Sequence, residues 1–408
     1  MPRLRMLRRA NDVRNRRIEA AFSNRLQCNI TPKKQAIPAV TFHRNFMPFQ
    51  AAPTHFATND RLGATSRRLT QKCTMTPARQ SITYMGCPNT PSQIGKPLVR
   101  SDLLHVVTCV SNPLRWQSRI ALYETFCQHM LDSGVNLTTV ECALGQRPFE
   151  LSKVGAPHVN YVPVRHTTIV WHKESLLNIG FSRLPRDAAY VAWIDADVTF
   201  RDPNWAAETV HALQQYAVVQ PWQNCYDLGP RGEHLELHTS FCSLVQEGKP
   251  ITPKWNQYHT FGHPGYAWAM RRETLANLGG LYAAAALGSA DHNMALAMLG
   301  RVNETFPSDI SPTFTQTMAA WQARAIEFVG QRIGFVPGTI EHGFHGPKAS
   351  RNYVSRWDIL RKSKFDPLTD LKPNLDGVIE LSGSKKGLQR DIEAYFRARD
   401  EDSNRPRA

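Results

Sequence analysis

Two carboxylates one residue apart follow the apolar run YVAWI directly. They belong to Asp195 and Asp197. Ligands of α/β proteins bind at the carboxyl ends of strands, and neighbouring carboxylates at such an edge are costly unless a cation or a proton compensates them. Oxygen ligands suit Mg²⁺ or Mn²⁺, and these ions commonly bridge to phosphates. The pair therefore favours a divalent-metal site, with a solvated acidic turn as the alternative.

The elements around this pair follow from the spacing of apolar residues. Short β-branched runs predict strands, and a period of 3.6 residues predicts helices. Strands are expected at 104–110, 135–144, 159–165, 188–200, 218–222 and 335–342, helices at 115–131, 173–185, 204–216, 291–300, 314–328 and 351–365, and a strand that feeds a helix at 266–281. Between residues 223 and 264 the pattern loosens into a Gly, His and Pro-rich stretch. Alternating strands and helices predict an α/β domain whose central sheet is mixed and largely parallel.

The positive charge lies in one part of the chain. Residues 1–100 carry 18 Lys and Arg against 3 Asp and Glu, so they account for the whole net charge of +15. We expect them to form a basic, disordered extension. Translated sequence upstream of the true start, a transit peptide and a nucleic-acid-binding arm are the alternatives. The neutral remainder argues against a nucleic-acid footprint on the folded domain itself.

The cysteines and the apolar runs indicate the compartment. None of the eight cysteines has the CxxC spacing of a zinc or redox site. Several lie in apolar runs, which suits buried thiols in a reducing compartment. Since no apolar run approaches the roughly 20 residues that span a bilayer, no transmembrane segment is expected. Together these features favour a cytoplasmic location.

Several short patterns occur in a fixed order. They are Lys173, then Asn178 and Gly180, then AYVAWIDADV, then Gly265 to Arg272, then Gly279 and Gly280, then Asp291, and last His342 and His345. In this order they resemble the GT-A class of nucleotide-sugar glycosyltransferases, notably family 2, and the layout is similar to that of bacterial and phage-encoded transferases. The resemblance covers roughly residues 103–365. It implies a GT-A-like three-layer α/β/α sandwich. Residue 290 is Ala, where the family usually has Glu.

The resemblance also implies roles for individual residues. Asp197 would bind the metal, Asp195 would bind the metal or sugar and ribose hydroxyls, and His342, or His345 in its place, would complete the metal site, since imidazole suits Mn²⁺. Asp291 would deprotonate the acceptor hydroxyl, which implies inversion, although Asp also favours a helix N-cap. The donor would contact Ser111, Asn112, Arg115, Lys173, Asn178, Gly265, Trp268 and Lys348. Turn chemistry, polar helix faces and, for Trp268 and Trp222, core packing are the alternatives.

The resemblance sets the expected boundaries. Residues 101–396 would form the glycosyltransferase domain, with a nucleotide-binding half at 101–200, an acceptor half at 201–365 and a helical extension at 366–396, followed by a polar tail at 397–408. The donor would be a nucleotide sugar, with UDP as the expected nucleotide, and the cofactor Mn²⁺ or Mg²⁺. The acceptor could be a glycan, a lipid carrier, a protein or a modified nucleobase.

Two other functions fit parts of the sequence. The run from Asp195 to Thr199 also fits the DxDxT pattern of haloacid-dehalogenase phosphatases, in which the first Asp is a nucleophile. That pattern belongs on the first strand of its core, whereas about 90 residues with predicted strands precede it here. A non-enzymatic protein that binds nucleic acid through its basic first hundred residues is the other alternative.

Overall fold

The computed structural model describes residues 100–151, 158–251 and 262–403, all within the unit Asn89–Ala408. Apart from Arg100, the basic extension predicted for residues 1–100 lies outside them, as do Cys28, Cys73 and Cys87. Within the described ranges, no helix is long and apolar enough to cross a membrane.

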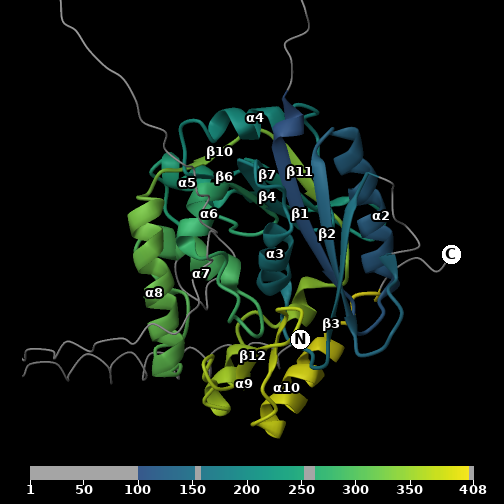
Figure 1. Cartoon of the computed structure of the whole chain (residues 1–408), viewed down its shortest axis with the longest axis vertical. Coiled ribbons are helices and arrows are strands. Elements are labelled where there is room, and N and C mark those ends of the chain that lie inside the picture. Colours follow the sequence, from purple (N-terminus) through teal and green to yellow (C-terminus); the bar gives the residue numbers. More distant parts are fainter. Residues whose placement is uncertain (1–99, 152–157, 252–261, 404–408) are drawn as a thin grey trace, which may run out of the picture. The chain divides into compact units, whose positions relative to one another are not determined.

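A seven-stranded sheet forms the centre of this unit (Figure 1). From edge to edge its strands are β10 (Ile333–Phe335), β6 (Val218–Gln220), β9 (Ala267–Arg271), β4 (Tyr190–Ile194), β1 (Leu104–Ser111), β2 (Asn136–Leu144) and β3 (Asn160–His166). Strand β9 pairs antiparallel with β4 and β6, and the other pairs are parallel. The predicted mixed, largely parallel sheet is confirmed.

Helices cover both faces of the sheet. They are α2 (Gln117–Asp132), α3 (Lys173–Ser182), α4 (Trp205–Ala212), α5 (Phe241–Gln246), α6 (Arg272–Leu278), α7 (Ala290–Met298), α8 (Pro312–Phe328), α9 (Trp357–Lys362) and α10 (Lys386–Arg397), with short 3₁₀ turns η1 (Ser101–Leu103), η3 (Val302–Glu304) and η4 (Lys348–Arg351). Successive strand residues point to opposite faces. In β4, Val191 and Trp193 therefore pack into a cluster with α3, α6, α7 and α8, while Ala192 and Ile194 pack with α2 and α4. The three-layer α/β/α prediction is confirmed.

A second sheet was not predicted. Its order is β5 (Val198–Phe200), β11 (Thr339–His342), β7 (Asn224–Leu228) and β8 (His234–Thr239). The single strand predicted at 335–342 is wrong, because Gly338 separates β10 in the central sheet from β11 in the second. The stretch 223–264 also contains more structure than its composition suggested. Strand β8 is exposed or half-buried along its whole length, so it lacks the alternation that identifies a strand.

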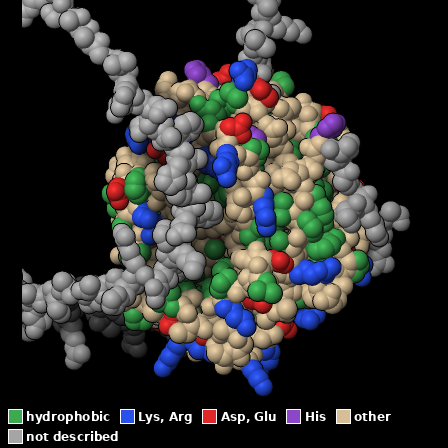
Figure 2. Space-filling view, in the orientation of Figure 1, with side chains coloured by type: hydrophobic (Ala, Val, Ile, Leu, Met, Phe, Trp, Pro, Cys, Tyr) green, Lys and Arg blue, Asp and Glu red, His purple; other side chains and the backbone are tan. Residues whose placement is uncertain are grey.

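The C-terminal part departs from the predicted pair of helices. Within 351–365 the main helix is α9, and an antiparallel hairpin of β12 (Leu371–Pro373) and β13 (Ile379–Leu381) precedes α10. Helix α10 buries an apolar face that includes Leu388 and Ile392. Figure 2 shows Lys and Arg side chains protruding at the end of the unit where Figure 1 places α9 and α10. The tail predicted from residue 397 does not trail away over its described part, since Arg399 and Glu401 are buried.

Candidate functional site

A cavity of about 540 Å³ opens where the carboxyl ends of β1 and β4 meet the N-termini of α3 and α7. Its volume lies within the range of small-molecule sites, roughly 300–1,000 Å³. The lining includes nine residues predicted from the sequence, which are Ser111, Lys173, Asp195, Asp197, Gly265, Asp291, His342, His345 and Lys348. The fold thus brings most of the predicted site together.

Backbone hydrogen bonds hold the loop from Asp195 to Asp197 on both sides. The N–H of Asp195 donates to the carbonyl of Tyr266 at 2.8 Å, and the N–H of Gly343 donates to the carbonyl of Asp197 at 2.8 Å. Because β11 pairs antiparallel with β5, His342 lies opposite Val198 and therefore next to Asp197. Tyr266 adopts a φ of 72°. This conformation is strained in a non-glycine residue, and such strain concentrates at functional sites.

Asp197, His342 and His345 form a cluster that can hold one metal ion. His345 Nε2 lies 3.2 Å from Asp197 Oδ2 and 3.3 Å from His342 Nε2, and His342 Nε2 lies 3.7 Å from the same oxygen. Donors about 2.1 Å from one ion lie about 3.0–3.4 Å from one another in octahedral or tetrahedral coordination. Two of the three separations fall in this range and the third, at 3.7 Å, is slightly longer, so a small adjustment of His342 would let the three share an ion. Asp197 Oδ1 is buried and has no hydrogen-bond partner among the described residues. A cation would satisfy that oxygen.

Charge also favours a cation at this point. His342 Nδ1 lies 2.8 Å from Asp227 Oδ1, so its other nitrogen faces Asp197. Burial alone would lower the pKa of His342, but the carboxylates of Asp197 and Asp227 raise it to about 9. Burial alone would raise the pKa of Asp197, but His342 and His345 hold it well below its usual range. Without an ion, a proton on His342 therefore compensates Asp197, and a bound metal would displace that proton.

Asp195 lies outside this cluster, in contrast to the prediction that it also binds the metal. Its Oδ1 forms an ion pair with the ammonium of Lys173, the first residue of α3. Burial alone would lower the pKa of Lys173, but the carboxylates of Asp195 and Asp291 raise it. The lysine stays charged and already compensates Asp195. The candidate metal cluster therefore consists of Asp197 and two histidines, and a metal contact of Asp195 stays a prediction.

Asp291 lies in the first turn of α7 and lines the cavity. Its Oδ1 accepts a hydrogen bond from the N–H of His292 at 2.8 Å. A Cβ on Gly265 would come within 3.3 Å of Asp291 Oδ2, so the glycine leaves room for this carboxylate. The preceding Ser289 has a φ of 76°, a second strained position beside the cavity. The N-cap of α7 is Ser289, so the N-cap alternative does not hold for Asp291, whose carboxylate lines the cavity from within the first turn.

Glu174 is a further carboxyl group in the cavity, and no sequence pattern distinguishes it from a glutamate in the first turn of an ordinary helix. It follows Lys173 in α3 and is buried. Burial raises its pKa to about 8, despite the opposing charge of Lys173. At neutral pH the Glu174 carboxyl group is therefore protonated in most molecules and can donate a hydrogen bond.

Lys348 lines the cavity but is surrounded by acidic groups. Its ammonium forms ion pairs with Asp227 and with Glu236, the second at 2.6 Å, and lies 2.8 Å from His238 Nε2. Asp227, Glu236 and His238 by themselves have the spacing of a metal site. The lysine takes the position of a cation among them, so the predicted contact with a diphosphate would require its release.

Besides Trp268, three predicted donor contacts do not line this cavity. Asn112 bonds the backbone of Trp116, and Arg115 pairs with Glu150. Both border a separate hollow of about 20 Å³. Asn178 donates to the carbonyl of Leu281 at 2.9 Å and accepts from its N–H at 2.8 Å. These contacts support the structural alternatives for the three residues.

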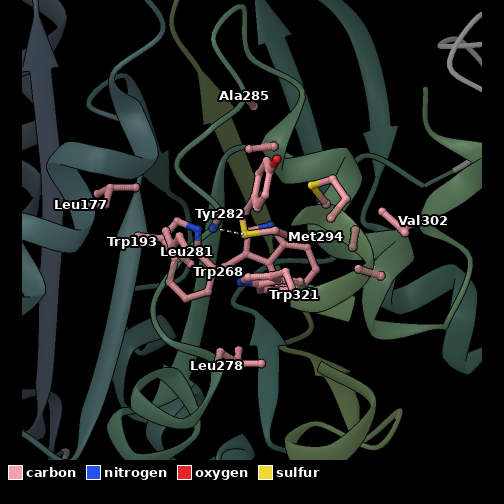
Figure 3. Close-up of a cluster of buried hydrophobic side chains, with 14 of the residues drawn as sticks. Leu177, Trp193, Trp268, Leu278, Leu281, Tyr282, Ala285, Met294, Val302 and Trp321 are labelled. Atoms are coloured by element: carbon pink, nitrogen blue, oxygen red, sulfur yellow. Dashed lines mark hydrogen bonds between the residues drawn. The ribbon is translucent and has the colours of Figure 1, made fainter. Parts of the chain in front are cut away.

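Trp268 and Trp222 are core residues. Trp268 is 3% exposed and stacks on Trp193, with the ring centroids 6.3 Å apart (Figure 3). Trp222 is fully buried and donates its Nε1–H to the carbonyl of Ala267. The core-packing alternative therefore holds for both, and neither can stack on a sugar in this conformation.

Four arginines that line the cavity were missed. They are Arg119, Arg351, Arg356 and Arg399. Arg351 donates to the hydroxyl of Tyr353 at 3.1 Å, and Arg356 donates to the hydroxyl of Ser289. Arg119 lies in a predicted helix, Arg351 and Arg356 fall where a longer helix was expected, and Arg399 falls in the expected tail. Nothing in their local sequence distinguishes them from solvated arginines.

Comparisons with known proteins place the chain beside several solved structures. Neither the scan of protein-family models nor the search of curated proteins finds a match. A mannosyltransferase, PcManGT from Pyrobaculum calidifontis in complex with GDP-Man and Mn²⁺, is similar at 16% identity and a TM-score of 0.36, over 72% of this chain and 71% of that one. S. aureus TarS 1–349 in complex with UDP-GlcNAc is similar at 11% identity and a TM-score of 0.34, over 60% and 59%.

A third similar structure has a different activity. It is the 4-diphosphocytidyl-2C-methyl-D-erythritol synthase from Anaerococcus prevotii DSM 20548, at 10% identity and a TM-score of 0.29, over 58% of this chain and 90% of that one. The chain spans less than two thirds of TarS 1–349. Similarity this low says nothing about activity, so the function proposed below depends on the cavity itself. The ligands named for these structures are ligands of those proteins alone.

Proposed function

We propose that this protein is a metal-dependent glycosyltransferase that moves a sugar from a nucleotide sugar to an acceptor hydroxyl with inversion. A UDP-sugar is the first donor to test. The observation that carries the proposal is the cluster of Asp197, His342 and His345, which lines one cavity together with Asp291. In one cavity, a metal cluster can stabilise the charge of a leaving group while a second carboxylate accepts the proton of an attacking hydroxyl.

The donor would lie along the carboxyl ends of β1 and β4. The Ser111 hydroxyl is buried at the end of β1 and has no hydrogen-bond partner among the described residues. The ion pair of Asp195 and Lys173 lies at the end of the neighbouring strand. These groups can accept and donate hydrogen bonds to the ribose or sugar hydroxyls of a donor.

The leaving group would lie at the metal cluster. When bound, the ion supplies positive charge to the departing diphosphate. Arg351, whose Nη2 lies 3.1 Å from His345 Nε2, and Arg356 line the same cavity. Guanidinium groups suit phosphate oxygens because their planar donors can form two parallel hydrogen bonds. We expect these arginines to hold the diphosphate beside the metal cluster.

Asp291 would act on the acceptor. Its carboxylate takes the proton of the acceptor hydroxyl as that oxygen forms a bond to the anomeric carbon. The bond between this carbon and the diphosphate oxygen breaks, and the nucleoside diphosphate leaves with the electron pair. One displacement of this kind inverts the anomeric centre. The acceptor class, whether glycan, lipid carrier, protein or modified nucleobase, is the next property to screen.

The test is calorimetric titration of the full chain with UDP and GDP, with and without Mn²⁺. We expect Mn²⁺-dependent nucleotide binding by the wild type, and binding about 100-fold weaker or absent in Asp197→Asn. Asp187→Asn is the matched control, because Asp187 is exposed, lies between α3 and β4 and does not line the cavity. Its binding should equal that of the wild type. Parallel titrations with Mg²⁺ and Zn²⁺ identify the ion, since two imidazoles suit transition metals better than Mg²⁺.

If the folded wild type bound neither nucleotide with any of these ions, the proposal would be wrong for these two donors. The phosphatase alternative would then be tested with a generic phosphate ester. The fold does not favour that alternative. Asp195 follows the fourth strand along the chain, and its carboxylate is paired with Lys173 rather than free to attack.

A further inference from the structure

The C-terminal segment Arg399–Asp402 lies beside the candidate metal cluster. Arg399 and Glu401 are 4% and 2% exposed. The backbone of the segment passes against Gly346, directly after His345. A Cβ on Gly346 would come within 2.9 Å of both the Asp400 carbonyl and Glu401 Cα. The segment therefore has a defined place, and its close approach requires a glycine there.

Asp402 attaches this segment to α2. Its two carboxylate oxygens accept hydrogen bonds from the N–H groups of Gln117 and Ser118, each at 2.8 Å. The first N–H groups of a helix lack partners within the helix, and a carboxylate there is favoured by the helix dipole. The N-cap residue of α2, Trp116, makes no side-chain capping bond. Asp402 supplies the cap that the helix does not provide for itself.

Glu401 is held as a fixed anion. Arg119 forms an ion pair with its carboxylate, with Nε 2.7 Å from Oε2, and donates from Nη2 to Oε1 at 2.9 Å. Arg399 Nε also donates to Oε1, at 2.7 Å. Oε2 also lies 3.5 Å from His345 Nδ1.

Each histidine of the cluster faces a second carboxylate, His342 at hydrogen-bond distance from Asp227 (2.8 Å) and His345 at 3.5 Å from Glu401. His342 faces Asp197 with one ring nitrogen and Asp227 with the other. His345 faces Asp197 with Nε2 and Glu401 with Nδ1. Metal-binding histidines commonly donate their second N–H to a carboxylate, which fixes the tautomer and leaves the first nitrogen free for the ion. Glu401 therefore lies on the Nδ1 side of His345 as Asp227 lies on the Nδ1 side of His342, and a shift of a few tenths of an ångström would bring it to hydrogen-bond distance.

We propose that Glu401 positions His345 for metal binding and that Asp402 holds Glu401 in place, so that the C-terminal segment completes the metal site. This inference depends on the metal site of the proposed function. It assigns a role in ion binding to a part of the chain that contributes no ligand itself. Arg119 supports the same role, because this arginine joins α2 to the Glu401 carboxylate.

The test is calorimetric titration of the full chain with Mn²⁺ alone, in the absence of nucleotide. Glu401→Gln keeps the shape and removes the charge, and we expect it to weaken Mn²⁺ binding about 10- to 100-fold. Asp402→Asn loosens the anchor and should cause a smaller loss. Asp400→Asn is the control, because Asp400 is exposed in the same segment and its φ of 43° is one that Asn accepts readily. Its affinity should match the wild type.

Thermal unfolding of the metal-free variants separates positioning from simple stabilisation. If Glu401→Gln and Asp402→Asn lower the unfolding temperature but bind Mn²⁺ as tightly as the wild type, the inference is overturned. If Glu401→Gln does not fold, Asp402→Asn decides, since it leaves the Glu401 carboxylate in place. If the wild type itself binds no Mn²⁺, the metal site of the proposed function fails, and that outcome differs from a wild type and variants with equal affinity.

Discussion

Lys173 and Asp195 form an ion pair in the cavity, joining the first turn of α3 to the end of β4. This contact separates the two neighbouring carboxylates by function. A fixed cation compensates Asp195, whereas Asp197 faces His342 and His345, where an exchangeable cation can bind. Two carboxylates one residue apart are thereby both neutralised with a single metal ion.

This division predicts opposite effects on two ligands when the lysine is removed. In Lys173→Gln the negative charge of Asp195 is no longer compensated, so the cavity attracts Mn²⁺ more strongly and repels a diphosphate. We expect Mn²⁺ alone to bind roughly 3- to 10-fold more tightly and UDP with saturating Mn²⁺ to bind more weakly by a similar factor. Calorimetry measures both constants. A fall in both affinities together would indicate a general loss of structure instead.

Replacing Asp291 should separate binding from chemistry. Asp291→Asn keeps an oxygen that can accept the His292 N–H bond but removes the basic carboxylate. We expect nucleotide binding with Mn²⁺ to stay within about 2-fold of the wild type, while the transfer rate falls about 10²- to 10⁴-fold, the range typical of a lost general base. Single-turnover transfer assays measure the rate once an acceptor is known. A variant that transfers sugar at the wild-type rate would leave Asp291 only its hydrogen bond to the N–H of His292.

The layers of the fold and the acidic pair beside the cavity could be predicted because each depends on local pattern. Apolar runs of period two and 3.6 gave the central sheet and its main helices, and the rule that ligands bind at carboxyl ends of strands selected Asp195 and Asp197. The exposed strand β8 and the hairpin of β12 and β13 lack such a pattern, so they were missed. Side chains that are far apart in the sequence but meet in the fold were missed as well, because no residue near Glu401 indicates that it lies beside His345.

Some patterns were found correctly but serve packing. Asn178 and the glycine pair Gly279–Gly280 were selected as parts of one resemblance, and the structure shows why they occur together. Asn178 bonds both backbone groups of Leu281, and a Cβ on Gly280 would lie 2.6 Å from Asn178 Oδ1. The motif joins α3 to the segment after α6. A sequence pattern cannot distinguish such a structural clamp from a donor contact, because both require the same residues at the same spacing.

Glu174 predicts a pH dependence of stability. Burial raises its pKa to about 8 in the folded protein, from the ordinary glutamate value of 4.5. Between these two values the folded state binds more protons than the unfolded state, so this group lowers the free energy of unfolding as the pH rises from about 4.5 to about 8. Glu174→Gln removes the effect, and we expect the variant to gain stability relative to the wild type over this range, on the order of a few kcal/mol at its upper end.

Urea unfolding of both proteins at several pH values between about 5 and 8 tests this, because contributions from all other groups cancel in the difference. Glu273→Gln is the control, since Glu273 is an exposed glutamate in α6. Its difference from the wild type should not change with pH. A pH-independent difference for Glu174→Gln as well would show that the carboxyl group is charged in the folded state.

Trp268 allows a direct choice between core packing and sugar binding. The ring is 3% exposed, stacks on Trp193 and donates its Nε1–H to the Pro264 carbonyl at 2.7 Å (Figure 3). We therefore expect Trp268→Ala to lower the free energy of unfolding by about 3–5 kcal/mol. Trp268→Phe, which fills most of the volume, should lower it by less and should keep Mn²⁺-dependent nucleotide affinity within about 2-fold of the wild type. Denaturant unfolding and calorimetry on the same samples measure both quantities. Full stability of Trp268→Phe combined with a large loss of nucleotide-sugar affinity would mean that the ring reaches the ligand after all, through a conformation in which it leaves the core.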